Sequence, residues 1–167
     1  MAAGDLRRRE RHVRRLGRGR IVDGSIPGVI AAPGPTGTPV HLAVPASSSA
    51  WSSGGVTLAF GADQDYSGSF WSSIDSYDRI AFHDGSTLLW SGRGDSVTTP
   101  ANGCQACQDM NRYVNFDFGA QGFDRIVLTG LGRASETDNH AYGQGPAPGA
   151  LALLGIGLAA LALSRRR

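Results

Sequence analysis

Apolar and polar residues alternate in short runs along much of the chain after Pro39. Alternation with a period of two is typical of a β-strand that buries one face and exposes the other. The apolar positions of these runs are Val40, Leu42 and Val44; Val56, Leu58 and Phe60; Ile80 and Phe82; Leu88 and Trp90; Val114, Phe116 and Phe118; and Ile126 and Leu128. Asp84-Gly85 lies between two of the runs and predicts a hairpin with a type I′ turn, whose two central residues both need positive φ.

The runs predict six or more short strands, spaced roughly 10–15 residues apart, with no helical period between them. The 24 glycines of the chain also argue against a helical body, because glycine lowers helix stability by roughly 1 kcal/mol relative to alanine. We therefore predict an all-β domain over residues 39–143, built as an antiparallel β-sandwich or jelly roll.

Charge is distributed unevenly along the chain. Residues 1–20 carry eight Arg against two acidic residues, whereas residues 21–163 carry five Arg against twelve. The domain is therefore acidic, and the basic pI of the whole chain is no argument that the domain binds nucleic acid. We expect no nucleic-acid partner.

Residues 1–38 are rich in Arg, Gly and Pro and lack the apolar stretch of a secretory signal. We expect this segment to be disordered. Its composition suggests a mis-assigned start or out-of-frame translation, and the alternative is a basic arm that binds RNA or anionic lipid.

Residues 144–167 have a different pattern. Pro146-Ala147-Pro148 is followed by the apolar stretch from Gly149 to Leu163, then by Ser164 and Arg165, Arg166 and Arg167. A helix of this length spans about 22 Å, which is short for a hydrocarbon core about 30 Å thick, but thinning of the bilayer permits insertion. A helix buried in the core of a domain would normally be amphipathic, whereas this stretch is apolar on all faces, which favours the membrane tail. The terminal arginines predict that the C-terminus lies on the cytoplasmic side of the membrane.

This tail closely resembles the PEP-CTERM sorting signal, with Ala147 at the position of the usual Glu between Pro146 and Pro148. The resemblance implies that the precursor is inserted in the inner membrane and processed by an exosortase. It also implies a final location at the cell surface or in the extracellular matrix of a Gram-negative bacterium that makes exopolysaccharide. Further segments resemble β-rich exosortase-dependent surface proteins, which share no established enzymatic activity; they are residues 70–82, 111–116, 123–128 and 134–140.

Five polar residues form a candidate calcium site. Asp63 and Asp65 lie two residues apart in an expected loop, and calcium takes six to eight oxygen ligands. Glu136, Asp138 and Asn139 would complete the site if the first and last strands were neighbours. The alternative is that these side chains only form turns with the backbone. We expect no other cofactor.

The two cysteines, Cys104 and Cys107, form a single C-x-x-C pair. We predict a local disulfide, as suits an exported protein. Zinc would need two further ligands, for which His83 and His140 are available in the sequence.

The aromatic residues are candidates for stacking on sugars, and Trp71 and Trp90 are the predicted glycan contacts. The alternative is that period-two aromatics form the core. The other aromatics of this kind are Trp51, Tyr66 and Tyr77.

No G-x-S-x-G or H-E-x-x-H motif occurs, and the four His residues are scattered. Asp75 and Asp78 are close in sequence but lie in a segment that looks structural. We therefore expect a non-catalytic exported surface protein. The alternative is a carbohydrate-binding module, stabilised by calcium, that acts in the exopolysaccharide layer.

Overall fold

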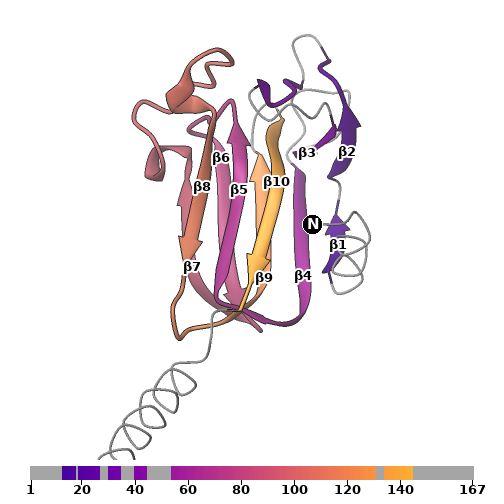
Figure 1. The fold of residues 1–167 in the computed structure, drawn as a ribbon, viewed down its shortest axis with the longest axis vertical. Helices are drawn as coiled ribbons and strands as arrows, with labels where there is room; N and C mark the ends of the chain where they lie inside the picture. Colours follow the sequence, from indigo (N-terminus) through magenta and orange to yellow (C-terminus); the bar gives the residue numbers. More distant parts are fainter. Residues whose placement is uncertain are drawn as a thin grey trace, which may run out of the picture.

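The computed structural model describes residues 13–17, 19–26, 30–34, 40–44, 54–130 and 134–144. Within these residues, ten strands form two five-stranded sheets, in which all neighbouring strands are antiparallel (Figure 1). Sheet A consists, in spatial order, of β1 (Val13–Gly17), β4 (Gly54–Gln64), β9 (Phe123–Gly130), β6 (Asp78–Asp84) and β7 (Thr87–Arg93). Sheet B consists of β2 (Arg20–Asp23), β3 (Val40–Val44), β10 (Ser135–Gly143), β5 (Tyr66–Ser72) and β8 (Arg112–Asp117).

The two sheets pack around one hydrophobic core, so the predicted all-β, sandwich-like fold is confirmed. Sheet A and sheet B both contribute alternate residues to this core, as the period of two requires. The buried members from sheet A are Val56, Leu58, Ile80, Phe82, Phe123, Ile126 and Leu128, and those from sheet B are Leu42, Val44 and Trp71.

The predicted hairpin joins β6 and β7, and Asp84 pairs with Thr87 across it. Its central residues are Gly85 and Ser86, and only Gly85 has positive φ, at 54°. The type I′ prediction is therefore wrong, because that turn needs positive φ at both positions.

Two strands lie in the segment that the sequence analysis expects to be disordered. β1 pairs with β4 and β2 pairs with β3, so each extends one sheet by an edge strand. The prediction of disorder is therefore wrong for these strands, and the β-domain begins before residue 39. Backbone hydrogen bonds to an existing sheet edge can hold a strand that has few apolar residues.

Two short 3-10 helices, η3 (Gly94–Ser96) and η4 (Gln108–Met110), lie in the long connection between β7 and β8. In the part of the chain that the structure describes, no helix is long and apolar enough to cross a membrane. The predicted tail helix, Gly149 to Leu163, lies outside that part.

Candidate functional site: a groove between two edge strands

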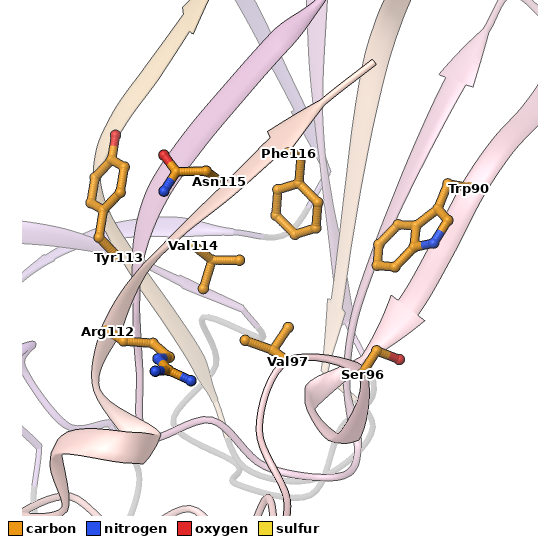
Figure 2. Close-up of a pocket in the computed structure, with 8 residues that line it drawn as sticks. All are labelled: Trp90, Ser96, Val97, Arg112, Tyr113, Val114, Asn115 and Phe116. Carbon is orange, nitrogen blue, oxygen red and sulfur yellow. The ribbon is translucent and has the colours of Figure 1, made fainter. Parts of the chain in front are cut away.

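β7 and β8 are edge strands of sheets A and B, and they lie on the same side of the molecule (Figure 1). A pocket of about 290 Å³ opens between them. Its walls come from β7, from the turn that follows β7 and from β8 (Figure 2). The lining residues are Trp90, Ser96, Val97, Arg112, Tyr113, Val114, Asn115 and Phe116. We call this pocket the β7–β8 groove.

Trp90 forms the β7 wall of the groove. Its ring lies 5.4 Å from that of Phe116 and 6.2 Å from that of Phe82, measured between ring centroids. These contacts hold one part of the indole against the core, while 36% of the residue remains exposed. A methyl group at Gly92 would clash with the indole. The absence of a side chain at Gly92 therefore provides the space in which the Trp90 ring lies.

The residues of β8 alternate between two faces. Val114 and Phe116 pack against the core, and Arg112 shares their face by the period of two. Arg112 is exposed because it is the first residue of the strand. Among the residues that the structure describes, its guanidinium has no hydrogen-bond or ion-pair partner. Figure 2 shows this guanidinium on the β8 side of the groove, with the Trp90 ring on the opposite side.

The other face of β8 carries Tyr113 and Asn115, which Figure 2 shows on the far side of the strand from Trp90. The Asn115 Oδ1 atom accepts a hydrogen bond of 2.7 Å from the Tyr66 hydroxyl. The Tyr113 hydroxyl donates a 3.3 Å hydrogen bond to the backbone oxygen of Asn139. Burial and the nearby Tyr66 hydroxyl raise the pKa of Tyr113, so Tyr113 stays a neutral hydrogen-bonding group at neutral pH.

The start of β8 is fixed by Asn111, which is buried and precedes Arg112. Its Nδ2 donates hydrogen bonds to three backbone oxygens of the preceding loop, at 2.8–3.2 Å, and two of these belong to Cys104 and Cys107. Its Oδ1 accepts a 2.7 Å hydrogen bond from the Ser72 hydroxyl in β5. Asn111 therefore ties the loop to sheet B directly beside the groove.

Cys104 and Cys107 are joined by a disulfide bond, with their Cα atoms 5.4 Å apart. This is the local disulfide that the C-x-x-C spacing predicts. It uses both cysteines, so neither thiol is available as a ligand for the alternative zinc site.

The structure separates the two predicted glycan contacts. Trp90 lines the β7–β8 groove, but Trp71 is only 2% exposed and its Nε1 donates a 3.2 Å hydrogen bond to the Ser135 hydroxyl. The prediction for Trp71 is therefore wrong, because β5 is an inner strand of sheet B and its inward-facing residues belong to the core.

The five predicted calcium ligands do not form one site. Asp65 follows β4 and its backbone nitrogen donates to the Gly143 oxygen, at the end of β10. Glu136 lies at the other end of the β5–β10 ladder, opposite Ser72. Six residues separate these two ends along β5, a distance of about 20 Å at about 3.4 Å per residue. The prediction is wrong because β10 runs antiparallel to β5, which places Asp63 and Asp65 far from the start of β10.

Asp138 and Asn139 lie within β10, where the ladder with β5 is irregular. Asn139 has a positive φ of 50°, and its backbone nitrogen donates to the Asp138 Oδ1 atom at 2.7 Å. This is the side-chain-to-backbone alternative that the sequence left open. In the described residues, no three His, Cys, Asp or Glu side chains are arranged to hold a metal ion.

Two carboxyl groups are buried away from the groove. Asp78 is 0% and Glu136 is 2% exposed. The Asp78 Oδ2 atom accepts a hydrogen bond from the Asp75 backbone nitrogen, and the Glu136 Oε1 atom accepts one from the Ala31 nitrogen, both at 3.0 Å. Burial raises the pKa of Asp78 to about 8 and that of Glu136 to about 9. Both groups are therefore neutral at pH 7, and neither lines the groove.

Arg112, Ser96 and Phe116 line the groove but were not among the residues that the sequence predicted for a site. The alternation in residues 112–117 could have placed Phe116 and Arg112 on one face, but no local signal brings that face next to Trp90. The proposed sorting motif, Pro146, Ala147 and Pro148, and the basic end, Arg165, Arg166 and Arg167, lie outside the described residues.

A scan of protein-family models finds no match for this chain, and a search of the curated proteins finds no significant match. The fold and the groove together define a class: an all-β, sandwich-like domain that has an aromatic groove between two edge strands.

Proposed function

We propose that this chain is a non-catalytic exported protein of the cell surface or extracellular matrix, inserted in the inner membrane by its tail and sorted by an exosortase. The observation that carries this proposal is the three-part tail: the Pro-Ala-Pro motif at 146–148, the apolar stretch from Gly149 to Leu163, and the final arginines. An all-β domain agrees with the β-rich surface proteins that the upstream segments resemble.

The test is to express the full chain behind a host secretory signal, with an epitope tag at the N-terminus of the mature protein. The hosts are a Gram-negative strain with an exosortase and the same strain without it. We expect a shorter form without the tail only in the first strain. Replacing Pro146 and Pro148 by Ala should reduce that processing, whereas replacing Pro100 by Ala should not. Identical full-length protein in both strains would contradict the proposal.

A second candidate function is glycan binding in the β7–β8 groove. It is favoured by the partly exposed indole of Trp90, which faces a strand that carries polar side chains. Binding sites for small molecules typically combine an apolar wall with a few polar groups in this way. Saturable binding on a glycan array, lost in Trp90→Ala but retained in Leu88→Ala, would support this function. Leu88 is a matched control because it is exposed on the same strand and does not line the groove.

A further inference from the structure

We infer that the β7–β8 groove binds an acidic saccharide, one whose sugar units carry carboxylates, in preference to a neutral one. The inference rests on the proposed glycan-binding function and specifies the chemical class of its ligand. Two features of the groove carry it: the charge of the residues that line it, and the placement of that charge relative to the indole ring.

The charge of the groove differs from that of the domain around it. Residues 21–163 carry five Arg against twelve acidic residues, of which only Asp78 and Glu136 are buried and neutral in the part of the chain that the structure describes. The net charge of the domain is therefore negative and disfavours an anion. The eight residues that line the groove, by contrast, include one guanidinium and no carboxylate. Within the described residues, Arg112 makes no ion pair, so its charge is available to a ligand.

The geometry of the groove suits a sugar ring with a carboxylate. A ring placed against the exposed part of Trp90 would extend across the groove toward Arg112 on β8, as Figure 2 allows the reader to follow. A guanidinium can donate two parallel hydrogen bonds to one carboxylate, and such charge-assisted pairs are stronger than bonds to neutral groups. Ser96 lines the same wall beside Trp90, and its hydroxyl oxygen accepts a 3.2 Å hydrogen bond from the Arg93 backbone nitrogen.

Arg112 is held in position by the chain that precedes it. The hydrogen bonds of Asn111 to the disulfide-closed loop and to Ser72 fix the first residue of β8. A fixed backbone limits the ordering that a ligand must impose, which lowers the entropic cost of binding. A neutral glycan would use the same indole but would leave the guanidinium without a carboxylate partner.

The test measures binding of the full chain to a polyuronate, such as oligogalacturonate, and to the neutral glucan dextran at low ionic strength. Isothermal titration calorimetry gives the affinity of each. We expect the polyuronate to bind at least about tenfold more tightly than dextran, equivalent to about 1.4 kcal/mol. Raising the salt concentration should reduce this preference, because salt screens exposed charges.

Two arginine variants separate a specific contact from general electrostatics. Arg112→Gln should abolish the preference and leave dextran binding unchanged, and Arg112→Lys should restore part of it. Arg79→Gln changes the net charge equally, but Arg79 is exposed on the outer face of sheet A and does not line the groove. Its affinities should equal those of the wild type.

Several results would overturn the inference. Equal affinity for the two glycans, or equal losses in Arg112→Gln and Arg79→Gln, would reject the acidic preference and leave glycan binding in place. Binding of neither glycan would reject both. Polyglutamate that binds as tightly as the polyuronate, with no loss in Trp90→Ala, would show that the groove takes an acidic peptide instead of a sugar.

Discussion

Asp78 and Glu136 should make the folded protein less stable as the pH rises from 6.5 to 8. Their pKa values are 3.8 and 4.5 in the unfolded chain and about 8 and about 9 in the folded protein, because burial disfavours the charged form. Below about pH 4 both states carry the protons, so these groups contribute no difference. Between about pH 4 and pH 9 the folded protein keeps protons that the unfolded chain has lost. The free energy of unfolding therefore falls as the pH rises, and it levels off above about pH 9.

The window from pH 6.5 to 8 isolates this effect. Burial lowers the pKa of His140 below its usual 6.5, so protonation of this residue in the unfolded chain opposes the trend mainly below pH 6.5 and fades as the pH rises through the window. Each carboxyl group contributes a slope of about 1.4 kcal/mol per pH unit. The slope from Asp78 falls as the pH approaches its pKa of about 8, so the two groups together remove about 3.5 kcal/mol over this window. This is a large part of the roughly 5–15 kcal/mol that stabilises a typical domain.

Urea denaturation of the full chain at half-unit steps of pH measures this slope. The double variant Asp78→Asn with Glu136→Gln should show little dependence over the window, since its amides do not titrate and retain an oxygen for the Asp75 and Ala31 nitrogens. Asp95→Asn is the control, because Asp95 is exposed and should leave the slope unchanged. A flat wild-type profile, or a double variant that keeps the wild-type slope, would refute the reasoning.

Three further changes test the structure around the groove. Gly92→Ala should displace the indole ring that lines the groove, altering its fluorescence and weakening glycan binding, whereas Gly143→Ala, with open space around it, should do neither. Replacing Cys104 and Cys107 by Ser should lower the free energy of unfolding by about 2 kcal/mol, because the disulfide closes only a short loop; no loss in urea denaturation would contradict this. Asn111→Ala should cost about 3 kcal/mol by leaving buried partners without hydrogen bonds, and a loss below 1 kcal/mol would show that the loop has another support.

Five strands have one face in the core and one toward solvent, which produces the alternation. β3 keeps the alternation through Val40, Leu42 and Val44 although its other face, with His41 and Ala43, is also buried. These six strands could be predicted from the sequence. β5 and β10 could not. Both are inner strands of sheet B, and their sequences contain small or polar residues that are buried on both faces, such as Ser67, Ser69, Glu136 and Thr137. Where both faces are covered, the alternation that marks a strand disappears. The two N-terminal strands were missed for another reason: they are held at sheet edges by pairing, which leaves no pattern in their own residues.

The candidate site could be predicted only in part, because it depends on the order of the strands. Trp90 lies in an alternating run with Leu88, whereas Trp71 lies in β5, which shows no such run. Neither local pattern tells which of the two indoles is exposed. Their difference arises because β5 is flanked by β10 and β8, whereas β7 has β6 on one side only. Arg112 reaches the same groove from a strand 22 positions further along the chain, and only the packing of the two sheets brings it opposite the indole.

The groove occurs where the sandwich must leave an edge open, and this explains its mixed chemistry. An unpaired edge strand invites another strand to add to it unless charged or bulky side chains obstruct the approach. On β8 that protection comes from Arg112, Tyr113 and Asn115, which are all exposed. The core at this edge is rich in aromatic rings. Trp90 packs against these rings on one side and remains partly exposed to solvent on the other. Of these side chains, only Arg112 lies on the face of β8 that is turned toward Trp90. A guanidinium that protects the edge and a partly exposed indole therefore border the same groove.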